Sequence, residues 1–265
     1  MITPTYEWQF APQVEDADFT KIAKKAGLGP EVARLLLERG IQDEESLKKF
    51  LEPTLEDLYD PYLLHDMDKA VERIRQAIEE GENILIYGDY DADGMTSASI
   101  VKESLEQLGA ECRVYLPNRF TDGYGPNASV YKYFIEQEGI SLIVTVDNGV
   151  AGHEAIELAQ SMGVDVIVTD HHSMPETLPD AYAIVHPEHP NADYPFKYLA
   201  GCGVAFKLAC ALLEEVQVEL LDLVAIGTIA DMVSLTDENR ILVQYGLEML
   251  GHTQRIGLQE MLDMA

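Results

Sequence analysis

The sequence has no long apolar run, which limits where the protein can act. No apolar stretch approaches the roughly 20 residues that a membrane-spanning helix needs. The first ten residues, MITPTYEWQF, also lack the basic and apolar regions of a signal peptide. We therefore expect a soluble protein with a cytoplasmic location.

Cysteine is scarce as well. Cys112, Cys202 and Cys210 form no Cys-x-x-Cys pair, and any disulfide scheme leaves one of them unmatched. Reduced thiols that serve in packing are the simpler interpretation.

Basic residues are few in relation to acidic ones. The chain holds 18 Lys and Arg against 47 Asp and Glu, a formal net charge of -29. Nucleic-acid binding normally relies on clustered Lys and Arg, so this charge argues against broad non-specific attraction to DNA or RNA. If the protein handles phosphates, another source of positive charge must act at the site.

The chain contains two regions that differ in the spacing of their apolar residues. From Asp18 to about Ile78, apolar residues recur at helical spacing, with breaks at Gly40, Pro53 and Pro61, which predicts a small helical module. From residue 84 onward, short apolar runs alternate with amphipathic segments that close on glycine. The runs are ILIYGD, CRVYLP, LIVTVD, DVIVTD and AIVHP, and the helical segments include SASIVKESLEQLG, ASVYKYFIEQEG and GHEAIELAQSMG. The expected fold is α/β, a doubly wound parallel sheet with a small N-terminal helical region.

Polar side chains gather where three of the predicted strands end. They are Asp89, Asp91, Asp93, Asp147, Asp170, His171 and His172. Ligands of parallel α/β sheets bind outside the carboxyl ends of the strands, so these side chains should converge on one edge. A single Asp after a strand is often a helix N-cap, but seven such groups at three strand ends favour a site.

Divalent metal ions explain this concentration of acids. Clustered carboxylates repel one another unless cations neutralise them, and carboxylate with imidazole suits Mn²⁺, or Mg²⁺ where oxygen dominates. Asp231, within the apolar segment AIGTIADMVSL, is a further acid that can join the cluster.

Two other protein families contain acidic loops of this kind, and each requires particular residues that can be checked in the sequence. An EF-hand loop that starts at Asp89 requires Glu at its twelfth position, which is Ile100, and a helix rather than a strand before it. A haloacid-dehalogenase-like phosphatase with Asp91 as nucleophile fits DADGMT fairly well. It leaves His171 and His172 unexplained, and it stays the main rival enzyme class.

Four motifs carry a resemblance to a known family. YGDYDADG, VTVDNG, VTDHH and GTIAD, in this order and spacing, resemble the motifs of the DHH phosphoesterase superfamily, specifically the RecJ-type single-strand-specific DNA exonucleases. The likeness extends through PNRFTDGYG and LAGCGVAF and into the helical preamble, so it covers nearly the whole chain.

The resemblance implies a domain organisation. Residues 1–67 would form the N-terminal helical region, residues 68–240 the DHH phosphoesterase domain, and residues 241–265 the start of a helical connector. RecJ-type proteins continue into a DHHA1 domain and often an oligonucleotide-binding fold. The resemblance therefore implies a catalytic-core fragment or a short form.

The resemblance also implies a ligand set for two metal ions about 3.5–4 Å apart. Asp147 would bridge the ions. Asp89 and Asp91 would complete one site, and Asp93, His171 and Asp231 the other. His172 would contact the scissile phosphate, while Asp170 would orient a ligating imidazole or cap the following turn.

Substrate contacts are expected from a second group of residues. Arg119 can clamp a phosphate with its guanidinium group, although a surface ion pair explains it equally well. Gly201 and Gly203 precede an apolar helix whose amides can bind an anion, and tight packing would also account for them. His186 follows the fifth run and can approach the substrate. Phe120 and Tyr124 can stack on bases; core packing is the alternative for such aromatics.

The predicted function is a two-metal exonuclease of single-stranded DNA that acts in repair and recombination. The family resemblance suggests digestion from the 5′ end, a monomer, and single-strand-binding protein and a helicase as partners. One alternative is a DHH-type phosphodiesterase for short oligonucleotides or cyclic dinucleotides. Another is a catalytically silent fragment that binds DNA or a partner protein.

Overall fold

The protein is described by a computed structural model, in which residues 16–264 are placed. The chain divides into two compact units, with the boundary between Thr54 and Leu55. The domain boundaries that the sequence analysis places after residues 67 and 240 stay predictions.

The first unit contains three short helices, α1 (Ala17–Lys25), α2 (Pro30–Glu38) and α3 (Glu44–Leu51). Each begins where the sequence provides a start signal: Asp16 caps α1, a proline opens α2, and Asp43 forms a capping box with Ser46 at α3. Phe19, Leu36 and Leu47 lie in the small core that the three helices share. The helical content predicted for this part of the chain is confirmed.

The second unit is built on a parallel sheet. Across residues 16–264 the strands are β1 (Ile84–Tyr87), β2 (Cys112–Tyr115), β3 (Leu142–Val146), β4 (Asp165–Thr169) and β5 (Ala183–Val185). Their order is β2-β1-β3-β4-β5, and every neighbouring pair is parallel. The five apolar runs of the sequence are these strands, so the predicted α/β parallel fold is confirmed.

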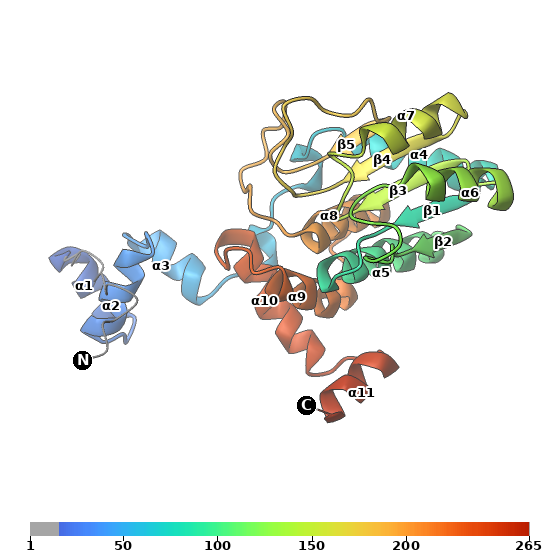
Figure 1. The fold of residues 1–265 in the computed structure, drawn as a ribbon. Coiled ribbons are helices and arrows are strands. Elements are labelled where there is room, and N and C mark those ends of the chain that lie inside the picture. Colours follow the sequence, from blue (N-terminus) through green and yellow to red (C-terminus); the bar gives the residue numbers. More distant parts are fainter. Residues whose placement is uncertain (1–15, 265) are drawn as a thin grey trace, which may run out of the picture. The chain divides into compact units, whose positions relative to one another are not determined.

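Helices cover both faces of the sheet (Figure 1). Alternate strand residues such as Ile84 and Ile86 pack with α4 (Met67–Glu80), α5 (Ala92–Gln107) and α8 (Gly201–Leu213). The intervening residues, such as Leu85 and Tyr87, pack with α6 (Ala128–Glu138) and α7 (His153–Ser161). Because both faces are covered, β1 and β3 are buried along their whole length, which explains their continuous apolar runs.

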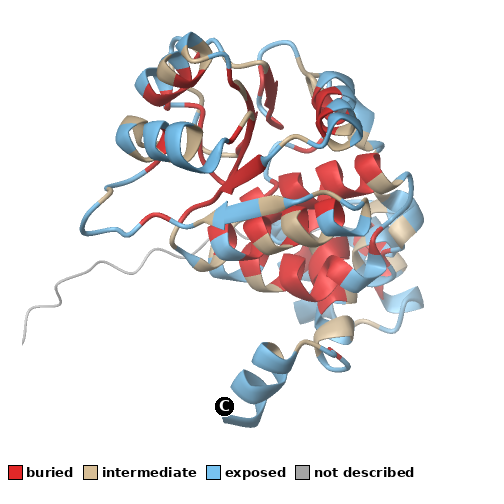
Figure 2. Ribbon diagram, turned by 90° about the vertical axis from the view of Figure 1, so that its right-hand side faces the viewer, coloured by how far each residue is buried: buried red, intermediate tan, exposed pale blue. Residues whose placement is uncertain are grey.

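The most deeply buried helix is α8. All of its residues except Leu213 are buried, and Figure 2 shows buried helical turns, drawn in red, in the interior of the unit. Helix α8 packs against α5 and α9 (Leu221–Ala230), and α9 packs against α10 (Asp237–Leu250). A last helix, α11 (Ile256–Met264), has no buried residue among those described.

The predicted helices agree with α5, α6 and α7, with one difference at a start. Helix α5 begins at Ala92, earlier than the apolar pattern indicates, because the Asp91 side chain accepts a hydrogen bond from the Gly94 N–H at 3.0 Å and caps it. The first turn of α5 is polar, so the apolar pattern of the sequence does not indicate where the helix begins. Three short 3₁₀ turns, η1 (Leu55–Asp57), η2 (Pro61–Leu63) and η3 (Val218–Leu220), complete the unit.

None of the helices within residues 16–264 is both long and apolar enough to span a bilayer.

Candidate metal centre

The strand-end residues meet where the strand order reverses. Chain order continues from β1 outward to β2 and then returns to β3 on the other side of β1. Open α/β sheets bind ligands at such a switch point, at the carboxyl ends of the strands. Asp89 follows β1, Asp147 follows β3, and Asp170 follows β4, so the three acids share this edge.

Asp147 lies at the middle of the centre, in an unusual backbone conformation. Its φ is 59°, the left-handed region that non-glycine residues rarely adopt. Its N–H donates to the Thr169 carbonyl at 3.0 Å, and Thr145 Oγ1 donates to the Asn148 carbonyl at 2.7 Å, so the turn is held on both sides. Asn148 adds a hydrogen bond from Nδ2 to the Val146 carbonyl at 3.0 Å. This network presents the Asp147 carboxylate to the switch point.

Three overlapping groups of side chains have the spacing of metal ligands. Within each group, one ligand atom from every residue lies within 4.8 Å of the others. The groups are Asp89 with Asp91 and Asp147, Asp93 with His171 and Asp231, and Asp147 with His171 and His172. The structure therefore brings together all six residues expected to hold metal ions.

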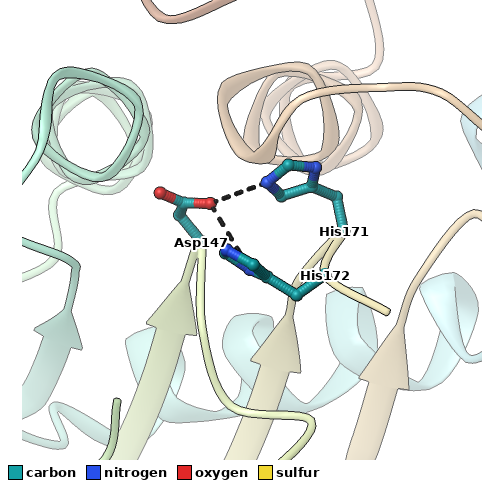
Figure 3. Close-up of side chains that lie close together, drawn as sticks. All are labelled: Asp147, His171 and His172. Atoms are coloured by element: carbon teal, nitrogen blue, oxygen red, sulfur yellow. Dashed lines mark ion pairs between the residues drawn. The ribbon is translucent and has the colours of Figure 1, made fainter. Parts of the chain in front are cut away.

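His171 joins the two halves of the cluster. Its Nε2 lies 3.1 Å from Asp147 Oδ1, 3.6 Å from Asp93 Oδ2 and 3.8 Å from Asp231 Oδ2. Figure 3 shows the Asp147 carboxylate facing both His171 and His172, with His172 Nδ1 farther away at 3.9 Å.

Asp93 is held by the N-terminus of α8. Its Oδ2 accepts a hydrogen bond from the Gly201 N–H at 2.7 Å, and its Oδ1 accepts one from the Cys202 N–H at 2.8 Å. The amides that the sequence suggested as an anion-binding group thus bind a carboxylate of the protein itself. A Cβ atom on Gly201 would lie 2.5 Å from Asp147 Oδ1, so the position also needs glycine for space.

Asp231 lies at the C-terminal end of α9, next to the buried acids. Helix α9 approaches α5 and α8 closely at Gly227, where an added Cβ atom would be 2.7 Å from Asp93 Oδ1 and 2.6 Å from Cys202 Sγ. This role of the glycine was not predicted from the motif GTIAD. The available signal was a glycine one turn before Asp231 in an apolar helix.

Asp170 orients the two histidines rather than facing the other acids. Its Oδ1 accepts hydrogen bonds from the His171 N–H at 2.7 Å and from His172 Nδ1 at 2.8 Å, and its Oδ2 accepts from the Val150 N–H at 3.0 Å. Burial opposes ionisation of Asp170, but the hydrogen bonds from His172 outweigh it and lower the pKa of the carboxyl. The hydrogen bond to Asp170 in turn raises the pKa of His172.

His186 lies beneath this loop, fully buried. Its Nδ1 accepts a hydrogen bond from the Glu188 N–H at 2.9 Å, so its Nε2 carries the proton and donates to the His172 carbonyl at 2.8 Å. Burial lowers the pKa of His186, in agreement with a neutral ring. Both ring nitrogens are therefore engaged with backbone, which supports a positioning role for this residue.

The β2–α6 loop supplies the remaining residues expected near substrate. Arg119 lies over the ring of Tyr90, with Cζ 5.4 Å from the ring centroid, and Phe120 is 95% exposed. Tyr124 reaches the histidine pair, with its hydroxyl 2.9 Å from His172 Nε2. Gly203, in contrast, packs against Leu199 inside the fold. The sequence did not indicate the Tyr124–His172 contact, because the two residues are 48 positions apart.

The electrostatics of the cluster suit cations. Burial raises the pKa of the Asp147 carboxyl to about 10, and the charge of Asp93 adds to the shift. Burial also raises the pKa of Asp89 and of Asp231. Asp147 Oδ1 and His171 Nε2 are buried, yet neither makes a hydrogen bond. Buried ligand atoms without hydrogen bonds, among acids whose ionisation burial opposes, fit divalent metal ions that would coordinate and neutralise them.

Comparison with known proteins agrees with this geometry. A family model described as "DHH family, N-terminal domain" matches residues 83–228, more than half of the chain. The chain belongs to the DHH family. The matched region includes β1 to β5 and every residue of the centre except Asp231.

Two curated proteins that are similar to this chain are named as exonucleases. The chain is 48% identical, over its whole length, to the single-stranded-DNA-specific exonuclease RecJ of Bacillus subtilis (strain 168), of which it covers 34%. It is 40% identical to the enzyme of the same name from Escherichia coli (strain K12), over 91% of this chain and 44% of that protein. The chain thus spans between a third and a half of the length of these relatives.

Solved structures give the same likeness. A crystal structure of exonuclease RecJ bound to manganese matches 79% of this chain and 53% of that chain, with a TM-score of 0.70 and 35% identity. RecJ in complex with Mn²⁺ from Thermus thermophilus matches 94% of this chain and 36% of that chain, with a TM-score of 0.77 and 32% identity.

Proposed function

We propose that this chain is the catalytic part of a metal-dependent exonuclease that hydrolyses the phosphodiester bonds of single-stranded DNA. The convergence of six metal-ligand side chains on the β1–β3 switch point carries the proposal. The names of the similar proteins support the substrate, because they are single-stranded-DNA-specific exonucleases.

Mn²⁺ or Mg²⁺ is the proposed cofactor, with two ions per chain. Asp89, Asp91 and Asp147 would hold one ion, and Asp93, His171 and Asp231, with Asp147 as the shared ligand, would hold the other. Two of these ligand atoms, Asp147 Oδ1 and His171 Nε2, are buried without a hydrogen bond, which supports this assignment. Bound there, two divalent ions would acidify a water nucleophile and neutralise charge on the phosphoryl group.

The protein's own groups would bind and orient the phosphate. His172 is held by Asp170 through Nδ1, so its other ring nitrogen is the one available to a phosphoryl oxygen. Arg119 is an exposed residue on the β2–α6 loop, and the planar fork of donors of its guanidinium group suits a phosphate. Phe120 and Tyr124, on the same loop, offer exposed rings to bases.

Several finer assignments belong to the same proposal. The protein would digest from the 5′ end, act in the cytoplasm in DNA repair and recombination, and work as a monomer with single-strand-binding protein and a helicase as partners. The net charge of -29 supports weak, frequently released binding of long strands, because few basic residues are available for phosphate contacts.

A panel of labelled substrates tests the proposal. The chain is incubated with Mn²⁺ and single-stranded DNA, duplex DNA, a dinucleotide or a cyclic dinucleotide, with and without excess chelator. We expect mononucleotides from single-stranded DNA and no hydrolysis in chelator. Hydrolysis of the dinucleotides alone would replace the proposal with a small-substrate phosphodiesterase, and hydrolysis in excess chelator would exclude the metal assignment.

A further inference from the structure

Tyr124 and Asp170 hold the two ring nitrogens of His172 from opposite sides. The Tyr124 hydroxyl lies 2.9 Å from His172 Nε2, and Asp170 Oδ1 lies 2.8 Å from Nδ1. An ionised carboxylate only accepts hydrogen bonds, so Nδ1 carries a proton, and in the ring that is protonated at both nitrogens the Nε2–H donates to the Tyr124 hydroxyl oxygen. The Tyr124 ring also stands edge-on to the imidazole, with the ring planes at 76°.

The loop that carries Tyr124 is held in place by further hydrogen bonds. The buried Tyr87 hydroxyl donates to the Gly125 carbonyl at 3.1 Å. Asp122 Oδ2 accepts from the Tyr115 hydroxyl at 2.7 Å, and Asn127 Nδ2 donates to the Asp122 carbonyl at 3.0 Å. These anchors come from β1, β2 and the start of α6, so the position of Tyr124 follows from the sheet itself.

The backbone on each side of Tyr124 is specialised. Gly123 has a φ of 80° and Gly125 a φ of 76°, both in the left-handed region that glycine adopts without strain. Two such residues around one tyrosine turn its side chain toward the Asp-His-His loop, 48 residues away.

The His172 ring lies close to a second position, among the metal ligands, and the contact with Tyr124 would keep it out of that position. Its Nδ1 is 3.9 Å from Asp147 Oδ1, and Asp147, His171 and His172 together have metal-ligand spacing. An imidazole free to turn could therefore join the metal ligands instead of facing the phosphate.

We propose that the Tyr124 hydroxyl is a positioning group which, together with Asp170, keeps the His172 ring away from the metal ligands and directs Nε2 to the scissile phosphate. Tyr124 acts through His172, and the Nε2–H passes from the Tyr124 hydroxyl oxygen to a phosphoryl oxygen when substrate binds. The inference rests on the proposed function for its kinetic consequences, whereas the state of the His172 ring can be measured without substrate.

The first test is a double-mutant cycle with Tyr124→Phe and His172→Ala. Tyr124→Phe keeps the aromatic surface and removes only the hydroxyl. We expect the single-turnover rate on single-stranded DNA to fall about three- to tenfold, the value of one hydrogen bond, with Mn²⁺ affinity within about twofold of the original. In the His172→Ala background, Tyr124→Phe should have no further effect. Multiplied losses in the double variant would overturn the proposal, because Tyr124 would then act independently of His172.

The second test follows the His172 ring by nitrogen NMR in the Mg²⁺-loaded protein, which is diamagnetic. Tyr124→Phe should shift the Nε2 resonance of His172 and leave that of His186 in place. Tyr133→Phe is the matched control, because Tyr133 is an exposed tyrosine on α6 and should shift neither resonance. An unchanged His172 resonance in Tyr124→Phe would contradict the contact itself. If the wild-type chain cleaves no DNA, the proposed function fails, and this measurement still decides whether Tyr124 positions the ring.

Discussion

The carboxylate of Asp93, in the first turn of α5, accepts a hydrogen bond from the Gly201 N–H at the start of α8, at 2.7 Å. The residues are 108 positions apart, and Cys202 donates the second hydrogen bond to the same carboxylate. The N-terminus of a helix favours negative charge, so the first turn of α8 stabilises the ionised carboxylate of Asp93. One carboxylate thus joins α5 to α8, and Gly227 brings α9 against the same group.

Replacing Gly227 by alanine tests this junction. The new Cβ atom would lie 2.7 Å from Asp93 Oδ1, so helix α9 must move away from the acid. Overpacking of this kind costs about 1–3 kcal/mol of unfolding free energy. We expect Gly227→Ala to lose stability by this amount in denaturant titrations and to bind Mn²⁺ more weakly in calorimetry. Gly257→Ala is the control, since nothing lies within 4 Å of a Cβ atom there, and it should change neither quantity. Unchanged Mn²⁺ affinity in Gly227→Ala would show that the packing of α9 against Asp93 does not support metal binding.

Asp147→Asn should make the metal-free protein more stable at neutral pH. Burial raises the folded-state pKa of Asp147 to about 10, far above its unfolded value of about 3.9. A raised pKa contributes stability that is complete below the unfolded pKa and is lost as pH rises toward the folded pKa. The stability advantage of Asp147→Asn should therefore grow as pH rises from about 5 toward 10, by at most about 1.4 kcal/mol per pH unit. Denaturant titrations in chelator at several pH values measure it, and an advantage that grows toward low pH would contradict the burial argument.

His172→Ala should separate chemistry from metal binding. His172 is held toward the phosphate, so its loss should leave Mn²⁺ binding intact and lower the single-turnover rate. The loss of one such electrostatic contact costs on the order of 10²–10³ in rate. Metal titration and single-turnover cleavage of the same preparation test both parts. A lost metal ion would identify His172 as a ligand, with His171 and Asp147 as its partners.

His186→Phe should loosen the loop that carries both histidines. The change leaves the Glu188 N–H and the His172 carbonyl, both in part-buried hydrogen bonds, without their partner. An unsatisfied buried group costs about 1–3 kcal/mol, so unfolding should need less denaturant. Exposed His153 provides the control, since His153→Phe should alter stability by less than about 0.5 kcal/mol. Equal unfolding free energies for His186→Phe and His153→Phe would contradict the positioning role of His186.

The strands and the gathering of acids could be predicted from the sequence, because both depend on local pattern. A run such as LIVTV is buried on both faces, and the rule that parallel strands end on one edge places Asp147 near Asp89. The start of α5 was harder, since its first turn is a polar ligand loop and Asp91 serves as the cap.

Contacts between distant segments could not be predicted in this way. The use of the α8 amides by Asp93 and the contact of Tyr124 with His172 depend on how helices and loops pack over 108 and 48 residues of chain. The left-handed backbone of Asp147 also has no sequence signal, because the turn is imposed by hydrogen bonds from neighbouring strands.

Calorimetric titration of Mn²⁺ into the wild-type chain and into Asp147→Ala tests the central claim most directly. We expect two ions to bind per wild-type chain. Because Asp147 is the proposed shared ligand, its removal should weaken both binding events at once. The control is Asp180→Asn, which alters an exposed acid between β4 and β5 and should retain both ions. Fewer than two ions in the wild type, or two ions bound with unchanged affinity by Asp147→Ala, would contradict a two-metal centre built around this residue.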